Sequence, residues 1–263
     1  MTLLSGTVLL TGATGGIGQA IARALAPRSR DLILSGRRRA VLDPLAAELG
    51  ARAITSDLSL PKEVERLIEE VGDVDVLIAN AGVPAAGELV EFAQDEIDRM
   101  LEVNLRAPVA LARALAPAMA RQGRGHMVFV SSLQGKAATP LSSVYCASKF
   151  GLRGFALALR EDLRRHGVGV SVVLPGFTSD AGMFAESGAK LPPWVGTRTP
   201  TDVARAVIAA VDHDRAEVEV APLGLRLGTA IASVAPALSA AVSRRLGSEQ
   251  IAARIVTGQR HTG

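Results

Sequence analysis

The fold is decided by the stretch Thr7-Val8-Leu9-Leu10-Thr11-Gly12-Ala13-Thr14-Gly15-Gly16-Ile17-Gly18, close to the start of the chain. Its first four residues are a continuous apolar run, which is typical of a strand buried on both faces of a parallel sheet. The glycines lead into a helical pattern from Gln19 to Ala26, which ends at Pro27. A strand, a glycine-rich turn and a helix in this order let the backbone approach a pyrophosphate and point helix amides at it. A tight turn without a ligand is the alternative. The residues predicted to bind a dinucleotide here are Gly12, Thr14, Gly15, Gly16, Ile17 and Gly18.

The second predicted strand, Asp31 to Ser35, ends beside a run of arginines, Arg37 to Arg39. In a dinucleotide-binding fold the group at this position faces the adenosine ribose. No carboxylate that would bind a 2′-hydroxyl stands there, and the next acid is Asp43. Arginine offers a planar fork to a phosphate. We therefore expect NADP(H) in preference to NAD(H), with Arg37 as the leading phosphate contact and Arg38 as the second. A solvated basic turn is the alternative.

Apolar strands and amphipathic helices alternate through the first 222 residues. Further strands are expected at 53–56, 74–79, 126–130, 170–174 and 217–220, and helices at 61–71, 91–119 and 201–211. This alternation predicts an α/β fold, a doubly wound parallel sheet in three layers (α/β/α) that forms a single domain.

Two segments are expected outside this alternation. Residues 177–199 are rich in Gly and Pro and carry apolar side chains, which predicts a substrate loop or, alternatively, a structural flap over the sheet edge. Residues 223–263 are expected to form a partly helical C-terminal tail that caps the site or contacts another subunit. Contact of this tail with a membrane surface is a less favoured alternative.

Polar and small residues follow the ends of several predicted strands, where open α/β sheets bind ligands. They are Asp57 and Leu58, Asn80 with Ala81 and Gly82, Ser132, and Pro175 with Gly176 and Thr178. For Asn80, Ala81 and Gly82, a plain strand-to-loop turn is the alternative. Asn104 interrupts an apolar helical stretch, and its apolar neighbours predict a buried, paired amide that braces the site.

Tyr145 and Lys149 are four residues apart and share one face of a predicted helix. Tyr145 is the only tyrosine of the chain and Lys149 is one of four lysines. A cation there favours the phenolate and would lower the pKa of a group that ordinarily titrates near about 10. The pair predicts acid–base chemistry, although packing of a tyrosine on a lysine stem is the simpler alternative.

The overall composition excludes several classes of protein. The net charge of +3 comes from scattered arginines without interleaved aromatics, so no nucleic-acid partner is expected. The lone cysteine, Cys146, cannot close an intrachain disulfide and fits a reducing compartment. No signal-peptide pattern opens the sequence, and the uncharged run at 227–242 is too short to span a membrane. We expect a cytoplasmic protein without a metal site.

Together these motifs resemble the short-chain dehydrogenase/reductase family in its short form. The resemblance covers roughly residues 5–222 and rests on motifs that stand in the family's order and spacing. They are the turn at 11–18, Asp57-Leu58, Asn80-Ala81-Gly82, Asn104, Ser132, Tyr145 with Lys149, and Pro175-Gly176. The resemblance implies a Rossmann-like fold with a nicotinamide cofactor along the carboxyl edge of the sheet.

The resemblance also implies roles for individual residues. Asp57 would face the adenine ring, Asn80, Ala81 and Gly82 would line the cofactor, and Asn104 would anchor a water leading from Lys149. Tyr145 would be the general acid/base, Ser132 would donate a hydrogen bond to the substrate oxygen, and Lys149 would stabilise the phenolate and hold the nicotinamide ribose.

The sequence departs from the family at one place. Thr178 and Asp180 stand where the family usually has an aliphatic residue and a threonine that contact the nicotinamide carboxamide. The carboxamide contact and the shape of the substrate loop are therefore left open.

The function expected from these features is an NADP(H)-dependent carbonyl reductase or alcohol dehydrogenase for an apolar small-molecule substrate. A 3-oxoacyl-thioester reductase is a close variant, and the family implies a homodimer or homotetramer. A non-catalytic NADP(H)-binding regulator would need the glycine turn and Arg37 but no proton donor. A nucleotide-sugar epimerase or dehydratase would need a larger region after residue 175.

Overall fold

The sheet contains seven parallel strands within the described part of the chain. The computed structural model describes residues 3–84, 86–179 and 196–237, together with 252 and 256. The strands lie in the order β3-β2-β1-β4-β5-β6-β7. They are β1 (Thr7–Thr11), β2 (Asp31–Gly36), β3 (Arg52–Thr55), β4 (Val76–Ala79), β5 (Gly125–Val130), β6 (Val168–Pro175) and β7 (Glu217–Val220).

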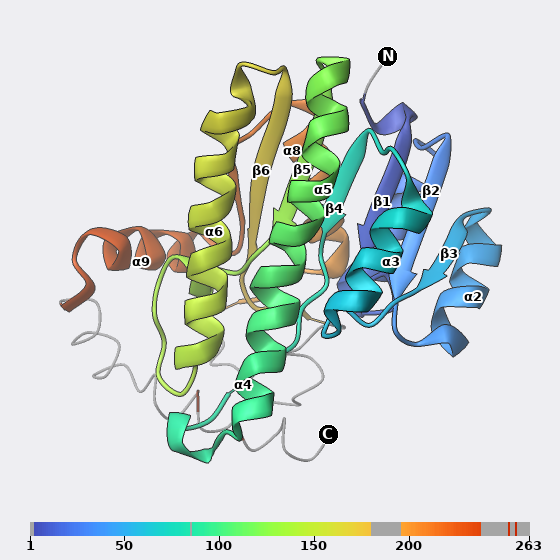
Figure 1. Cartoon of the computed structure of the whole chain (residues 1–263). Helices are drawn as coiled ribbons and strands as arrows, with labels where there is room; N and C mark the ends of the chain where they lie inside the picture. Colours follow the sequence, from blue (N-terminus) through green and yellow to red (C-terminus); the bar gives the residue numbers. More distant parts are fainter. Residues whose placement is uncertain (1–2, 85, 180–195, 238–251, 253–255, 257–263) are drawn as a thin grey trace.

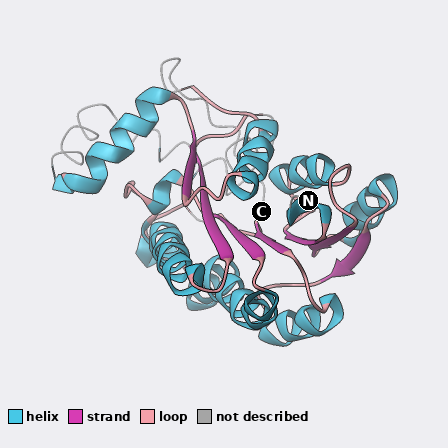
Figure 2. Ribbon diagram, turned by 90° about the horizontal axis from the view of Figure 1, so that it is seen from above, coloured by secondary structure: helices cyan, strands magenta, loops and turns pink. Residues whose placement is uncertain are grey.

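Helices cover both faces of this sheet (Figure 1 and Figure 2). One face packs against α3 (Pro61–Val71), α5 (Ala107–Gln122) and α6 (Ser143–Arg164), and the other packs against α1 (Gly16–Leu25), α2 (Arg39–Leu49) and α8 (Pro200–Asp212). A further helix, α9 (Leu223–Val234), follows β7 and lies beside the main body. The prediction of a three-layer, doubly wound fold is confirmed.

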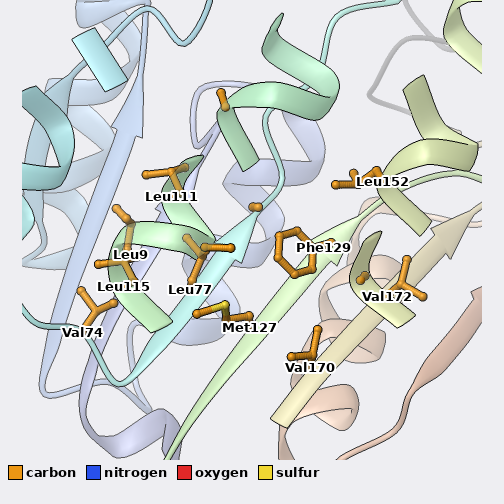
Figure 3. Packing of buried hydrophobic residues seen from close by; sticks show 14 of the residues in the cluster. Leu9, Val74, Leu77, Leu111, Leu115, Met127, Phe129, Leu152, Val170 and Val172 are labelled. Atoms are coloured by element: carbon orange, nitrogen blue, oxygen red, sulfur yellow. The ribbon is translucent and has the colours of Figure 1, made fainter. Parts of the chain in front are cut away.

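The apolar runs of the strands supply the core on both faces, because successive side chains point to opposite sides. Leu9 belongs to the cluster under α3, α5 and α6, whereas Val8 and Leu10 belong to the cluster under α1, α2 and α8. Figure 3 shows Leu77, Met127 and Phe129 of the first cluster beneath helix residues such as Leu111 and Leu152. This explains why the strands read as continuous apolar runs without alternation.

The long helix predicted at 91–119 is interrupted in the structure. A short turn, η2 (Leu89–Glu91), precedes α4 (Gln94–Leu101), and a π-helical turn, η3 (Glu102–Arg106), separates α4 from α5. The extra residue of a π turn shifts the register of the side chains and is frequent at functional sites. Asn104 lies in the middle of this turn.

The strand order places a crevice at the carboxyl edge of the sheet. From β1 the chain builds outward to β2 and β3 and then returns to the other side of β1 as β4. Ligands of open α/β sheets bind where the order reverses in this way. Within the described residues, no helix is long and apolar enough to cross a membrane.

A buried histidine links strands at the opposite, amino end of the sheet. Nε2 of His126 lies 2.8 Å from Oγ of Ser171, and its Nδ1 lies 3.9 Å from Asp214. The side chain is 1% exposed. Burial, more than the neighbouring charges, lowers the pKa of His126 from 6.5 to about 4, so the imidazole is neutral in the folded protein at neutral pH.

Stability should therefore fall as the pH drops from 6.5 to about 4. In this window the unfolded chain binds a proton at His126 that the folded chain does not, which costs about 3 kcal/mol in total. Urea unfolding at a series of pH values measures this slope, and His126→Gln should remove it. The same slope in the variant would contradict the assignment, because carboxylates such as Asp214, whose pKa is lowered chiefly by Arg160, act at lower pH.

Candidate active site

A cleft of about 440 Å³ opens at the carboxyl edge of the sheet. Its walls come from the ends of β1, β2, β4, β5 and β6 and from the first turns of α1 and α6. The structure brings together there all the residues predicted to bind the cofactor, as well as Ser132: Gly12, Thr14, Gly15, Gly16, Ile17, Gly18, Arg37, Arg38, Asp57, Leu58, Asn80, Ala81, Gly82, Tyr145, Lys149, Pro175, Gly176 and Thr178.

The cleft also contains residues that the sequence analysis did not select. They are Ser35, Gly36, Ser56, Val83, Pro84, Val103, Val130 and Ser131. The signal that could have found Ser35, Gly36, Ser56 and Ser131 is their place at or next to a strand end, beside predicted site residues. Val103 has no such signal, since it lies within the π turn η3 and not at a strand end.

The glycine turn is shaped by close backbone contacts. Gly12 has a φ of 67°, and a Cβ there would lie 2.6 Å from Cα of Ala81. A Cβ on Gly18 would lie 2.1 Å from the carbonyl oxygen of Gly12. Both positions therefore require glycine. At Gly15, by contrast, a Cβ would meet only the oxygen of Gly12 at 3.6 Å, so the space beside Gly15 is open.

These features fit a dinucleotide. Helix α1 begins at Gly16 without a side-chain cap from Gly15, so its first amides remain available to a phosphate. Beside the glycine turn, Oγ of Ser35 is the one buried side-chain oxygen or nitrogen of the described residues without a hydrogen-bond partner. A polar ligand group beside it would satisfy that oxygen.

The two arginines after β2 make different contacts. Arg38 donates to the carbonyl oxygen of Thr14 in the glycine turn. Nη1 of Arg37 lies 3.8 Å from Oδ2 of Asp57. Burial raises the pKa of Asp57, but hydrogen bonds from Ser59 and the charge of Arg37 outweigh it and leave the pKa below its ordinary value. Asp57 is thus a carboxylate at neutral pH.

Tyr145, Lys149 and Ser132 meet at the end of β5. Tyr145 is 7% exposed and Lys149 is 2% exposed. The Lys149 ammonium donates to the carbonyl oxygen of Val130 at 3.2 Å and lies 5.7 Å from the centre of the Tyr145 ring. An interaction with the Ser132 hydroxyl favours the phenolate form of Tyr145. Ser132 Oγ also accepts the amide of Gln134 at 3.1 Å.

The electrostatics of this group differ from the expectation based on spacing alone. Burial raises the pKa of Tyr145 above its ordinary value, and the interaction with Ser132 only partly opposes this. Burial also lowers the pKa of Lys149 to about 8. The prediction that Lys149 lowers the pKa of Tyr145 is therefore wrong for the chain by itself, because burial sets the direction of the shift and Lys149 is not among the groups that oppose it. Tyr145 is a protonated phenol at neutral pH, the state that can donate a proton.

Asn104 lies behind the cleft and does not line it. Its Oδ1 accepts the amide of Val83 at 2.8 Å, and its Nδ2 donates to the Val83 carbonyl at 3.0 Å and to Ser148 Oγ at 3.3 Å. Ser148 in turn donates to the carbonyl oxygen of Tyr145 at 2.7 Å. The buried amide thus ties the segment after β4 to α6, while the water proposed beside it stays a prediction.

The predicted substrate loop at 177–199 is described only in part. Thr178 is 4% exposed, lines the cleft and pairs with Arg198 in a parallel bridge. Asp180 and residues 181–195 of the predicted substrate loop lie outside the described residues. The same holds for most of the tail after residue 237.

The fold and the cleft define a Rossmann-like dinucleotide-binding protein. The chain belongs to the short-chain dehydrogenase family, whose profile matches residues 6–192. It is therefore an NAD(P)-dependent oxidoreductase of that family, as the motifs predicted.

Three related proteins illustrate the similarity. The ketoacyl reductase HetN of Nostoc sp. is 38% identical over 230 residues, which cover 84% of this chain and 80% of HetN. A metagenomic short-chain oxidoreductase solved in complex with NADP is 34% identical, with a TM-score of 0.69 over 83% of this chain and 96% of that one. A short-chain dehydrogenase from Sphingobium yanoikuyae in complex with NADPH is 28% identical, with a TM-score of 0.76 over 92% and 95%.

The glycine turn makes a prediction that separates folding from binding. Gly18→Ala should lower the free energy of unfolding by about 1–3 kcal/mol, because its methyl group overlaps the backbone of Gly12. Gly15→Ala should keep the unfolding free energy within about 0.5 kcal/mol of the parent, since its methyl group meets open space. It should nevertheless weaken binding of NADH and NADPH. Urea unfolding and fluorescence titration measure the two quantities, and unchanged nucleotide affinity in Gly15→Ala would contradict the placement of the phosphates.

Proposed function

We propose that this protein transfers hydride between NADP(H) and the carbonyl or secondary alcohol of an apolar small molecule, with Tyr145 as the general acid/base. The observation that carries the proposal is the buried Tyr145, which lines a cleft that fits a dinucleotide together with Ser132 and Lys149. A phenol held in its protonated form is a suitable donor for reduction.

The residues of the chain divide the work as follows. The turn from Gly12 to Gly18, Arg37, Asn80 and Lys149 would hold the cofactor, which when bound supplies the hydride. Ser132 donates a hydrogen bond to the carbonyl oxygen, and Tyr145 transfers its proton to the same oxygen as negative charge develops there. In alcohol oxidation Tyr145 accepts the proton instead. The ammonium of Lys149 stabilises the phenolate that remains after proton transfer.

The preference for NADP(H) is supported by the charges at the end of β2. Arg37 and Arg38 line the cleft beside the unpaired hydroxyl of Ser35, and no acid follows β2 before Asp43. Two similar structures hold NADP or NADPH. A guanidinium binds a phosphate through parallel hydrogen bonds that a hydroxyl cannot make with it.

A 3-oxoacyl thioester is the second candidate substrate. Its support is the similarity to the ketoacyl reductase HetN. A regulator without turnover is disfavoured because binding alone needs neither Tyr145 nor Ser132. Assembly as a homodimer or homotetramer and a cytoplasmic location stay predictions from the sequence.

Tyr145→Phe should lower kcat for NADPH-dependent reduction by at least about a hundredfold, because it removes the proton donor. The dissociation constant of NADPH should change little, since the ring remains. A graded panel of ketones and acyl thioesters, followed by NADPH absorbance, measures the rate and the substrate class together. Full activity of the variant on an accepted substrate would contradict the proposed role.

Arg37→Asp should weaken NADPH binding by about ten- to a hundredfold and favour NADH, because a carboxylate repels the phosphate and accepts a ribose hydroxyl. Arg39→Asp is the matched control. Arg39 is also exposed and lies two residues further along the chain. It pairs with Asp43 at 2.9 Å and does not line the cleft. The affinity of the Arg39→Asp variant for NADPH should stay within about twofold of the affinity of the parent protein. Equal losses in the two variants would indicate a general effect of charge.

A further inference from the structure

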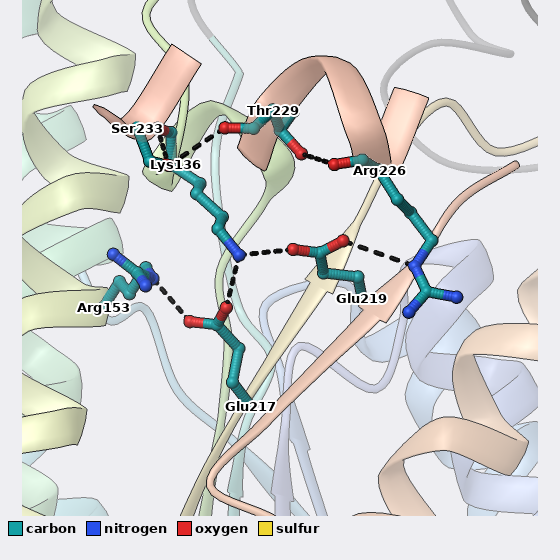
Figure 4. A network of polar contacts seen from close by, with 7 residues as sticks. All are labelled: Lys136, Arg153, Glu217, Glu219, Arg226, Thr229 and Ser233. Carbon is teal, nitrogen blue, oxygen red and sulfur yellow. Dashed lines mark hydrogen bonds and ion pairs between the residues drawn. The ribbon is translucent and has the colours of Figure 1, made fainter. Parts of the chain in front are cut away.

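A cluster of five charged side chains lies outside the cleft, between β7, α6, α9 and the turn η4 (Leu133–Gly135) (Figure 4). Lys136 Nζ lies 2.8 Å from Glu217 and 2.5 Å from Glu219. Arg153 of α6 contacts Glu217 at 2.6 Å, and Arg226 of α9 contacts Glu219 at 3.3 Å. None of the five lines the cleft.

The centre of this cluster is shielded from water, whereas Arg226 at its rim is half exposed. The side chains of Lys136 and Glu219 are 16% and 12% exposed. The alternating sequence of β7 predicts a half-exposed strand, and Val218 and Val220 do pack toward α8. The acidic face, however, meets cations from three other elements. Burial favours the neutral form of Lys136, but the two glutamates outweigh it and raise its pKa, so that it is charged at neutral pH.

Lys136 ends the turn that begins at Ser132. Within this turn the amide of Gln134 donates to Ser132 Oγ, the amide of Gly135 donates to the Ser132 carbonyl at 2.9 Å, and the amide of Lys136 donates to Leu133 at 2.9 Å. The position of Ser132 is therefore tied, through one short turn, to the position of Lys136.

The other side of the turn rests on α6 at Lys149. Ser131 Oγ donates to the carbonyl oxygen of Lys149 at 2.9 Å, and a Cβ on Gly135 would lie 2.6 Å from that oxygen. The turn is thus held by α6 on one side and by the ion pairs of Lys136 on the other. The start of the turn is also anchored in the core by Leu133, which is 7% exposed. At its end, apart from the ion pairs, the turn has its local bonds and the hydrogen bond from Ser233 of α9 to the Lys136 carbonyl at 3.2 Å.

We propose that Lys136 is a positioning residue for Ser132: its ion pairs with Glu217 and Glu219 fix the η4 turn and thereby the hydroxyl that binds the substrate carbonyl. Arg226 and Ser233 join α9 to the same cluster, so the docking of α9 is coupled to the position of Ser132. The inference rests on the proposed role of Ser132 in carbonyl reduction.

Lys136→Met tests this by removing the ammonium and keeping the stem. It should lower kcat about tenfold or more, because a small displacement of a group that contacts the reacting carbonyl is costly. Lys136→Arg should restore most of the rate. Arg160→Met is the matched control, since Arg160 also joins α6 to the β7 side through Asp214 at 2.7 Å, but at the amino end of the sheet. Its kcat should stay within about twofold of the parent below its unfolding temperature.

A double-mutant cycle distinguishes positioning from general destabilisation. If Lys136 acts through Ser132, Lys136→Met should cost less than about twofold in a Ser132→Ala background. An unchanged kcat in Lys136→Met, a multiplicative loss in the double variant, or an equal loss in Arg160→Met would each overturn the proposal. Should Lys136→Met fail to fold, Glu219→Gln breaks one ion pair and undergoes the same comparison.

Hydrogen exchange gives a readout that does not depend on activity. The amides of residues 134–137, which form the bonds of the turn, should exchange about tenfold faster in Lys136→Met and at the parental rate in Arg160→Met. Unchanged exchange in Lys136→Met would overturn the proposal. If the parent protein reduced no carbonyl compound, the proposed function would be wrong. The hydrogen-exchange rates of the turn would still show whether Lys136 orders it.

Discussion

The site depends on an ammonium group that is almost removed from water. Lys149 is 2% exposed, and its Nζ contacts the Val130 carbonyl at 3.2 Å. Burial of a charge is costly unless hydrogen bonds compensate, and the lowered pKa of about 8 reflects that cost. The surrounding backbone is built to hold this helix turn: Ser131 binds the Lys149 carbonyl, and Gly135 has no side chain to obstruct the contact. The ammonium is thus kept at the end of β5, where it lines the cleft.

The same burial determines the state of Tyr145. A buried phenol and a buried ammonium are both driven toward their neutral forms, so the pKa of the first rises while that of the second falls. The interaction with Ser132 opposes the rise, since it stabilises the phenolate. Helical spacing correctly places the two side chains together, but the sign of the pKa shift depends on solvent access. The solvent access of the two side chains is set by β5, η4 and α6 together. It cannot be obtained from the four-residue spacing of Tyr145 and Lys149 in the sequence.

The parts of the molecule that sequence predicts well are those encoded locally. Apolar runs give the strands, and the glycines after β1 give a turn whose close contacts accept no side chain at Gly12 and Gly18. The parts that sequence misses depend on distant partners. The π turn around Asn104 has no local signal in the sequence. The side-chain amide of Asn104 is hydrogen-bonded to the backbone of Val83, 21 residues away. The acidic face of β7 is covered by cations distant in sequence, among them Lys136, which lies 81 residues before Glu217.

The chemistry and the substrate wall are carried by different parts of the chain. Ser132, Tyr145 and Lys149 all come from the continuous unit of β5, η4 and α6, which is packed together by core contacts such as the edge-to-face pair of Phe129 and Phe155. The nucleotide end of the cleft comes from β1, β2 and β4. The proposed acid–base group is therefore held by the core, on elements separate from those that form the nucleotide end of the cleft. The ion pairs of Lys136 join this unit to β7, and Arg226 joins α9 to the same cluster, so under the proposed role of Lys136 these elements would act on the position of the Ser132 hydroxyl without contacting the reacting atoms.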